Sequence, residues 1–228
     1  MTGVVGLRVI AIDGPAGAGK STIARALAHR LGLEYLDTGA MYRAVTWAAL
    51  EHGIDPAATE PIAALAAALA LDVGETGVLV DGVDATTAIR TPEVTTAVSA
   101  VAANSAVRAE LRRRQRAWGE ERSGGVIEGR DIGSVVFPDA VLKLHLTASP
   151  RVRAERRVAE AGGSIDEIEA AIATRDHHDR TRADGPLAEI DDAVVVDTTG
   201  LGVDDVLAIV EQLLRRAEAG GEPVGEPT

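Results

Sequence analysis

The sequence predicts an α/β fold of three layers, in which helices cover both faces of a parallel β-sheet. Short β-branched runs alternate with segments of helical spacing, an order that implies parallel strands joined by right-handed crossovers. A glycine-rich turn joins the first such run to the first helix. The chain has 228 residues, of which 46% are hydrophobic and 25% charged, enough apolar material for one sizeable domain spanning residues 1–228. Cysteine is absent, which excludes disulfides and thiolate metal sites.

The first strand and helix carry the clearest local signals. RVIAID at residues 8–13 is a buried strand that stops at Gly14, and residues 20–31 form an amphipathic helix that ends at Gly32. The doublet Gly124-Gly125 is expected to interrupt regular secondary structure before a later strand. Similar patterns predict further strands at 33–36, 126–127, 141–146 and 193–197, and helices at 40–52, 56–71, 91–103, 106–122, 150–161, 164–182 and 203–219.

One segment departs from the alternation of strands and helices. Between residues 73 and 83, four valines are separated by three glycines, which predicts short antiparallel strands with tight turns. This stretch therefore reads as an insertion in the α/β core. The C-terminal residues 219–228 (AGGEPVGEPT) are expected to be a disordered tail.

The charge distribution restricts the partners. A net charge of −12 disfavours a general affinity for nucleic acid, because phosphate contacts need a basic footprint. The longest apolar stretch, residues 62–71, is too short for a membrane span, which needs about 20 residues. The N-terminus lacks the features of a signal peptide, so a cytoplasmic protein is expected, with a monomer as the default. Arginine clusters in an acidic chain favour a small anionic ligand held in one cleft.

Residues 14–22, GPAGAGKST, match the phosphate-loop template G-x-x-x-x-G-K-[ST] between a strand and a helix, which indicates the P-loop NTPase fold. Glycines let successive N–H groups converge on phosphate oxygens, and the helix N-terminus adds its positive dipole end. Lys20 supplies an ammonium for the β- and γ-phosphates, and the hydroxyl of Ser21 suits Mg²⁺. The predicted ATP-binding residues are Gly14, Pro15, Ala16, Gly17, Ala18, Gly19, Lys20, Ser21 and Thr22.

The phosphate loop alone leaves several functions open, because GTPases, motor ATPases and small-molecule kinases share it. The chain lacks the guanine-reading N-K-x-D, and strand 126–127 runs into Glu128-Gly129-Arg130-Asp131 instead of a Walker-B acidic pair. A small-molecule kinase would need further arginines for a second phosphate. Five arginines beside turns, glycines or other polar residues meet that need: Arg43, Arg108, Arg130, Arg175 and Arg182.

Four motifs in order make the interpretation more specific. DTGAMYR at 37–43, the arginine-rich helix around 108–116, EGRD at 128–131 and RDHHDRTR at 175–182 closely resemble bacterial cytidylate kinases, over residues 8–219. The resemblance implies transfer of the γ-phosphoryl group of ATP to CMP or dCMP in pyrimidine nucleotide metabolism. It also implies a monophosphate-binding region with an insertion at about 38–103 and a lid at about 161–183. The alternatives are another P-loop kinase, of shikimate or a coenzyme A precursor, and a nucleotide-regulated binding protein.

The resemblance also assigns roles to single residues. It places the cytosine against Thr38, Arg108, Asp131 and Arg182, the sugar against Ser99, Arg175 and Asp179, and the acceptor phosphate against Arg43 and Arg130, with Tyr42 packed beside them. The residues expected to take part in catalysis are Lys20, Arg130, Asp131 and Arg175. A carboxylate can accept from the cytosine amine while arginines donate to ring N3 and O2, whereas uracil would leave buried groups unpaired. Glu128 stands where some relatives have Asp, and its role stays open.

Other charged residues receive simpler interpretations. One of Arg151, Arg153, Arg156 and Arg157 is expected to reach the ATP phosphates, with Arg157 favoured, although spacing does not distinguish them. Arginines 112–114 are expected to lie on a solvated helix face. In the lid, Gly162-Gly163 is a candidate hinge, and closure would exclude water from the reaction.

Overall fold

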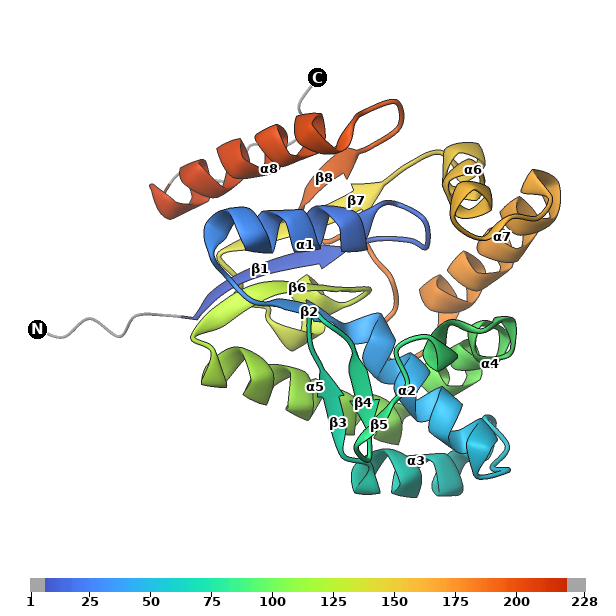
Figure 1. Ribbon diagram of the computed structural model, residues 1–228. Helices are drawn as coiled ribbons and strands as arrows, with labels where there is room; N and C mark the ends of the chain where they lie inside the picture. Colours follow the sequence, from blue (N-terminus) through green and yellow to red (C-terminus); the bar gives the residue numbers. More distant parts are fainter. Residues whose placement is uncertain (1–6, 221–228) are drawn as a thin grey trace, which may run out of the picture.

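A five-stranded parallel sheet forms the centre of the protein (Figure 1). The structure, a computed structural model, describes residues 7–220. Strand order is β2-β6-β1-β7-β8, which confirms the predicted α/β class with a parallel sheet. The strands are β1 (Arg8–Asp13), β2 (Tyr35–Asp37), β6 (Gly124–Gly129), β7 (Leu142–Thr147) and β8 (Val194–Asp197).

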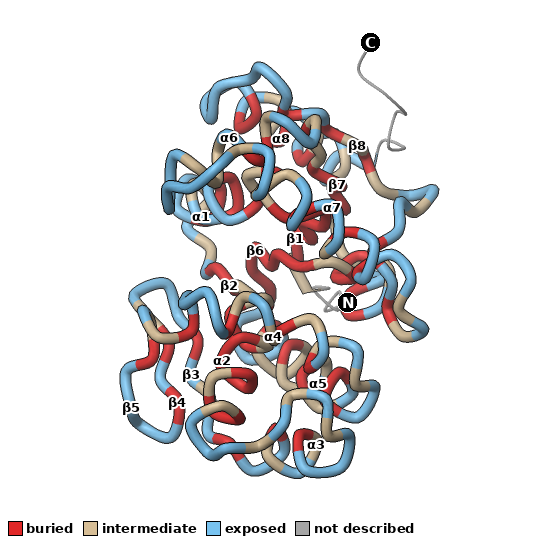
Figure 2. The backbone as a smooth tube through the Cα atoms, turned by 90° about the vertical axis from the view of Figure 1, so that its right-hand side faces the viewer, coloured by how far each residue is buried: buried red, intermediate tan, exposed pale blue. Residues whose placement is uncertain are grey.

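Both faces of the sheet are covered, which explains why β1 is apolar along its length. Val9 and Ala11 pack into one hydrophobic cluster with α5, and Ile10 and Ile12 pack into another with α1 and α8. Buried residues accordingly follow the central strands (Figure 2). The helices are α1 (Lys20–Leu31), α2 (Thr38–Glu51), α3 (Thr59–Ala68), α4 (Pro92–Ala103), α5 (Ser105–Glu121), α6 (Pro150–Ala161), α7 (Ile165–Thr181) and α8 (Val203–Glu218).

The predicted antiparallel strands form a separate three-stranded sheet in the order β3-β4-β5. Its strands are β3 (Leu71–Val73), β4 (Val78–Val80) and β5 (Val83–Asp84). The β4–β5 turn consists of Asp81 and Gly82, with φ of 49° and 80°. Positive φ at both positions is what a tight two-residue hairpin requires, and the Asp-Gly pair tolerates it. The sheet and α3 lie together at the lower side of the molecule in Figure 1.

The sequence suggested that Gly124 and Gly125 interrupt regular secondary structure. In the structure these two residues begin β6. A Cβ atom at Gly125 would lie 2.7 Å from the ring of Trp118, and one at Gly124 would lie 2.3 Å from the carbonyl oxygen of Arg8. These glycines therefore serve close packing inside the sheet. Of the expected tail, residues 219 and 220 form a turn, and residues 221–228 lie outside the described part.

Two short elements were not predicted. A single 3₁₀ turn, η1 (Ala88–Arg90), precedes α4, and a π-helical turn, η2 (Ile132–Val136), follows β6. The carboxylate of Asp13 accepts hydrogen bonds from the N–H groups of Ile132 and Gly133, each 2.8 Å long, and so fixes the start of η2. No helix within residues 7–220 has the length and apolar character that crossing a membrane demands.

Candidate active site

The phosphate loop connects β1 to α1 at the carboxyl edge of the sheet, where ligands bind in open α/β folds. Gly14 must be glycine, because its φ is 146° and a Cβ atom there would lie 2.0 Å from the carbonyl oxygen of Leu146 in β7. Lys20 is buried, and its ammonium donates a 2.8 Å hydrogen bond to the carbonyl of Pro15 across the loop. Residues 16–22 line a cavity of about 500 Å³, whereas Gly14 and Pro15 lie outside its lining.

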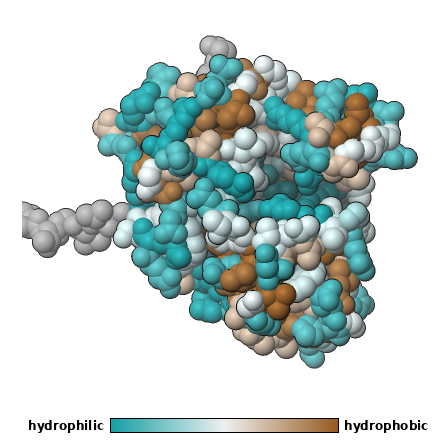
Figure 3. Space-filling model, viewed as in Figure 1, coloured by the Kyte–Doolittle hydropathy of each residue, from teal (hydrophilic) through white to brown (hydrophobic). Residues whose placement is uncertain are grey.

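The cavity extends from the phosphate loop to several other parts of the chain. Asp37 and Glu128 line it at the ends of β2 and β6, and Leu201 and Val203 line it after β8. In the space-filling view, a hollow with a largely hydrophilic floor opens between the part with α6 and α7 and the lower part of the molecule (Figure 3). The cavity thus combines polar groups of the loop with the exposed apolar side chains of Leu201 and Val203.

Arg153 on α6 supports the phosphate loop from behind. Its guanidinium donates to the carbonyl oxygens of Ala16 and Ala148, at 3.1 Å each, and to a carboxylate oxygen of Asp176 on α7 at 2.6 Å. Both side chains of this ion pair are buried, with 6% and 4% exposed. Arg153 does not line the cavity, so it acts as a structural residue behind the loop.

The structure separates the other three arginines of α6. Arg151 is half exposed and pairs with Asp166 outside the cavity. Arg156 and Arg157 both line the cavity, and Arg156 donates to the hydroxyl and carbonyl of Thr198 at 2.9 and 2.8 Å. The four candidates for an ATP contact therefore reduce to Arg156 and Arg157 among the cavity-lining residues.

Two carboxylates lie near the lysine and serine of the phosphate loop. Burial and the nearby charge of Asp37 raise the pKa of Glu128, although Lys20 opposes this shift, and Glu128 also accepts a hydrogen bond from the Tyr35 hydroxyl. Burial and the charge of Arg130 lower the pKa of Lys20 to about 7. Among residues 7–220, no group of three or more His, Cys, Asp or Glu side chains is arranged to hold a metal.

This oxygen-rich set nevertheless fits Mg²⁺. Magnesium in nucleotide sites is held by a few protein oxygens together with substrate phosphates and water. The hydroxyl of Ser21 and the carboxylates of Asp37 and Glu128 line one cavity and are hard oxygen donors. They could hold the ion once phosphate oxygens complete its coordination.

A second pocket, of about 50 Å³, adjoins the larger cavity. Gly39, Gly129, Arg130 and Arg175 line both of them, so the two spaces meet at a pair of arginines. The second pocket contains nearly all residues expected to bind the acceptor: Thr38, Tyr42, Ser99, Arg108, Arg130, Asp131, Arg175, Asp179 and Arg182. Arg43, expected with them, lines the larger cavity.

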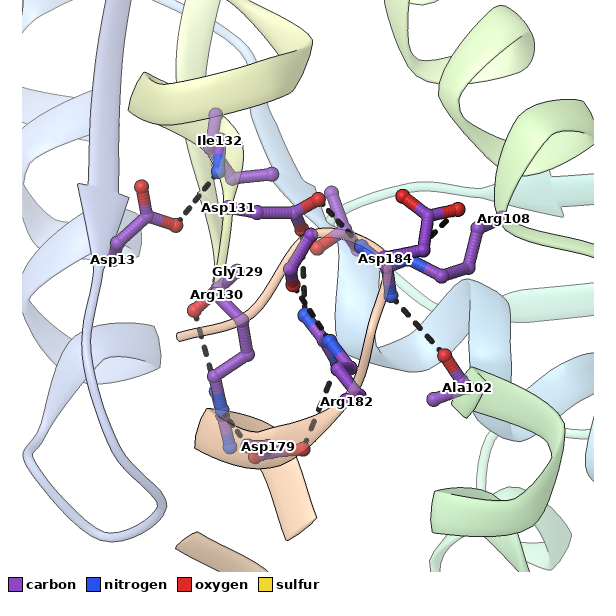
Figure 4. A network of polar contacts seen from close by, with 12 residues as sticks. Asp13, Ala102, Arg108, Gly129, Arg130, Asp131, Ile132, Asp179, Arg182 and Asp184 are labelled. Carbon is purple, nitrogen blue, oxygen red and sulfur yellow. Dashed lines mark hydrogen bonds and ion pairs between the residues drawn. The ribbon is translucent and has the colours of Figure 1, made fainter. Parts of the chain in front are cut away.

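Asp131 is the centre of a charged network in the second pocket (Figure 4). Its Oδ2 accepts a 2.5 Å hydrogen bond from Nη2 of Arg108, whose side chain is almost fully buried. Nη2 of Arg182 lies 3.7 Å from Oδ1 of Asp131. The Arg108 guanidinium also lies 5.5 Å from the ring centre of Tyr42, within the range of a cation–π contact.

Asp179 fixes the arginine at the boundary of the two spaces. It accepts a 2.8 Å hydrogen bond from Nε of Arg130 and lies 3.6 Å from Nη1 of Arg182. Burial raises the pKa of Asp179, but the charges of Arg130 and Arg175 outweigh it and hold this pKa below its ordinary value. Thr38 is oriented by the backbone, since its hydroxyl donates to the carbonyl of Glu128 at 2.6 Å.

Several arginines lie where the two spaces meet, and burial shifts the pKa of two of them. Burial and the charge of Arg175 lower the pKa of Arg43 to about 9, and burial and the charge of Arg130 lower the pKa of Arg175 to about 10. A guanidinium group whose pKa is lowered by burial and by a neighbouring cation is stabilised by an added anion. The place where the two spaces meet is therefore suited to phosphate.

Sequence reasoning missed several residues of the site, among them Arg90, Arg112 and Asp184. Arg90, in η1, lines the larger cavity and lies 3.4 Å from Asp37. Arg112 was expected on a solvated face, but it is only 20% exposed and pairs with Asp131 and Asp184. Its spacing of four from Arg108 on the same helix was the available signal, because such residues share a face. Nothing in the local sequence marks Asp184.

Comparison with known proteins agrees with these features. The family model for cytidylate kinase matches residues 10–216. A cytidylate kinase from Corynebacterium efficiens is 49% identical over 94% of this chain and 96% of that protein. A bifunctional pantoate ligase/cytidylate kinase from Synechococcus sp. is 50% identical over 92% of this chain, which spans only 43% of that longer protein. Several other curated relatives are similarly long, so the chain spans less than half of their length.

A solved structure supports the fold alone. The crystal structure of an uncharacterized protein from Eubacterium ventriosum superposes with a TM-score of 0.54 at 12% identity, covering 92% of this chain and 98% of that one. The match of the family model across most of the chain, together with 49% identity over nearly the full length of a relative, is decisive. The chain belongs to the cytidylate kinase family.

Proposed function

We propose that this chain transfers the γ-phosphoryl group of ATP to CMP or dCMP, producing ADP and CDP or dCDP. The observation that carries the proposal is the junction of two spaces at Arg130 and Arg175. One space carries a phosphate loop and the other carries donors and acceptors for a nucleoside monophosphate. The family membership, and the cytidylate kinase from Corynebacterium efficiens in particular, support the choice of cytosine.

The larger cavity suits ATP. Its phosphates would lie on the backbone N–H groups of the loop, near Lys20 and the arginines of α6. Leu201 and Val203, which line the same cavity and have exposed fractions of 36% and 46%, offer apolar contact for the adenine ring. Mg²⁺ bound by Ser21 with Asp37 and Glu128 would neutralise phosphate charge.

The smaller pocket suits cytosine. Nε of Arg108 and Nη2 of Arg182 are buried and have no hydrogen-bond partner among the described residues, while Asp131 offers carboxylate oxygens. Cytosine presents an amine that donates and two atoms, N3 and O2, that accept. Uracil would place a carbonyl oxygen against Asp131, and a buried mismatch of that kind can cost a factor of about 10⁴ in specificity. We assign the sugar hydroxyls to Ser99, Arg175 and Asp179, which line the same pocket.

Transfer itself needs positioning and charge neutralisation. The groups that would neutralise charge during transfer line the larger cavity. Lys20 comes from the phosphate loop, and Arg43, Arg130 and Arg175 belong to the set proposed to bind the acceptor. The acceptor phosphate is already ionised at neutral pH, so no general base is required. We assign the lid to residues 161–183, with Gly162 and Gly163 as its hinge, since their φ values of 74° and 104° favour glycine. We further expect a cytoplasmic monomer.

An acceptor panel tests the proposal. ADP release is measured with MgATP and CMP, dCMP, UMP, AMP, shikimate or no acceptor, and Arg130→Met serves as the variant with a damaged junction. CMP and dCMP should exceed UMP by about 10³-fold or more in kcat/KM, as buried hydrogen-bonding sites do. A preference for UMP, AMP or shikimate would refute the base assignment. Slow ADP release that no acceptor accelerates would favour a nucleotide-regulated binding protein.

A further inference from the structure

An ion pair between α5 and the segment after α7 adjoins Asp131 and has no role in the function proposed above. Nη2 of Arg112 donates to Oδ1 of Asp184 at 2.5 Å and to Oδ2 of Asp131 at 3.3 Å. Oδ2 of Asp184 also lies 3.9 Å from Nε of Arg108. Arg112 therefore bridges Asp131, which lines the second pocket, and Asp184, which lies 72 residues after Arg112 in the sequence.

The pair determines which oxygen of Asp131 is available. Oδ2 accepts from both Arg108 and Arg112. Within residues 7–220, the one cation paired with Oδ1 is Arg182, at 3.7 Å, beyond hydrogen-bond distance. Two donors on one oxygen fix the rotation of the carboxylate and leave Oδ1 as the acceptor for the pocket. Figure 4 shows Asp131 and Asp184 beside the Arg108 side chain, which reaches in from α5.

The Arg112–Asp184 pair also holds the segment that follows α7 against α5. The backbone at Gly185 lies so close to the network that a Cβ atom there would be 2.2 Å from Oδ2 of Asp131. Nε of Arg182 donates to the carbonyl of Gly185 at 2.6 Å, so the position of Gly185 also orients Arg182. Asp184 thus connects the end of the expected lid to α5 through Arg112.

We propose that Arg112 and Asp184 are a positioning pair that sets the orientation of Asp131 and the place of residues 182–185, and thereby determines the preference for cytosine. The inference rests on the proposed kinase function and names residues that act through Asp131, without contact to the substrate. The electrostatics agree with this geometry. Burial raises the pKa of Asp184, but the hydrogen bond from Arg112 outweighs it and keeps this pKa below its ordinary value.

Removal of either partner has a defined consequence. Without Arg112, Oδ2 of Asp131 keeps a single donor, and Asp184 loses its closest cation. Without the charge of Asp184, Asp131 is the remaining carboxylate paired with Arg108 and Arg112 among the described residues, and residues 182–185 lose their link to α5. In the first case Asp131 can rotate, and in the second Arg182 loses the support of the Gly185 carbonyl. In both cases the affinity for cytosine should fall while the ATP cavity stays intact.

The experiment compares Arg112→Leu, Asp184→Asn and the double variant with the wild type. Readouts are kcat, KM for CMP, KM for ATP and the CMP-to-UMP ratio of kcat/KM. Each single variant should raise KM for CMP by about 10-fold, the effect of one charge-assisted hydrogen bond. The ratio should fall, kcat and KM for ATP should change little, and the double variant should resemble the single ones because the two residues act together. Arg113→Ala is the control on the same helix, since Arg113 is exposed and, in the described part of the chain, pairs with Glu110 alone.

The outcomes separate this inference from the proposed function. A wild type that ignores CMP refutes the function. A wild type that prefers CMP, with both single variants within twofold of it in KM for CMP and in the CMP-to-UMP ratio, overturns the positioning pair. A lowered unfolding temperature with unchanged KM for CMP also overturns it, because it reveals a structural role only. If Arg112→Leu does not fold, Asp184→Asn alone decides.

Discussion

Replacing Arg153 by Met tests the claim that this arginine supports the phosphate loop and does not contact ATP. The side chain lies behind the loop, where it joins Ala16 to Asp176 on α7. One oxygen of Asp176, Oδ1, is buried with no hydrogen-bond partner among the described residues, so Arg153 is its main source of stabilisation. Methionine keeps the aliphatic stem and removes the charge.

The expected loss follows from burial on both sides of the pair. Removing one partner of a buried ion pair leaves an uncompensated charge and costs about 3–5 kcal/mol. The lost hydrogen bonds to the carbonyls of Ala16 and Ala148 add about 1 kcal/mol each. The free energy of unfolding should therefore fall by about 5–7 kcal/mol, a large part of the 5–15 kcal/mol typical of a domain.

Urea unfolding followed by circular dichroism at neutral pH measures this loss. Arg151→Ala, in the same helix, is the control, because Arg151 is exposed and its removal should leave the unfolding midpoint unchanged. A double variant, Arg153→Met with Asp176→Leu, removes both charges and should recover most of the lost stability. It also keeps the test decisive if the single variant does not fold.

Two results would refute the reasoning. An Arg153→Met variant within about 1 kcal/mol of the wild type would show that the pair carries no net stabilisation. A double variant less stable than Arg153→Met would show that Asp176 has another, favourable partner.

Three further predictions concern titratable groups. Because burial lowers the pKa of Lys20 to about 7, the unfolded chain binds more protons above that pH, so the unfolding free energy of the wild type should rise relative to Lys20→Met between about pH 7 and 10 in urea titrations. Burial raises the pKa of Asp13 to about 6, so its contribution to the free energy of unfolding is present below about pH 4 and is lost as the pH rises through about 6. Equal pH slopes of the unfolding free energy for Asp13→Asn and wild type would contradict this. Asp131→Asn should lower kcat/KM for CMP by about 10²-fold and reduce the CMP-to-UMP ratio, with KM for ATP unchanged in steady-state kinetics.

Local signals account for what the sequence could predict. Helix α1 runs from Lys20 to Leu31 as expected, because its apolar spacing is regular and Gly32, with φ of 63°, ends it in the left-handed conformation. The phosphate loop was identifiable because its backbone geometry demands glycine at fixed positions. The antiparallel insertion followed from valines separated by glycines.

Tertiary contacts account for what the sequence could not predict. In the sequence, Gly124 and Gly125 resemble an interruption between two elements. They lie in β6, at a place where Trp118 and the backbone of Arg8 leave no space for side chains. Strand β2 pairs with β6, so that residues as distant in sequence as Tyr35 and Val126 lie side by side. The local sequence pattern gives no signal for that pairing. The bridge from Arg112 to Asp184 is equally distant in sequence.

The arginines of α6 show the same limit at the site. Spacing made Arg153 as good a candidate for ATP as Arg157, since residues four apart share a helix face. The structure distinguishes them by their place along the helix, because Arg153 lies behind the phosphate loop whereas Arg157 lines the cavity.

The most direct test of two anion sites meeting at one junction is a crystal structure with CMP and a non-hydrolysable ATP analogue. We expect the triphosphate on residues 14–22, the CMP phosphate among Arg43, Arg130 and Arg175, and the cytosine amine at Oδ1 of Asp131. A complex in which the CMP phosphate lies away from Arg130, or in which the base turns another edge to Asp131, would contradict the account.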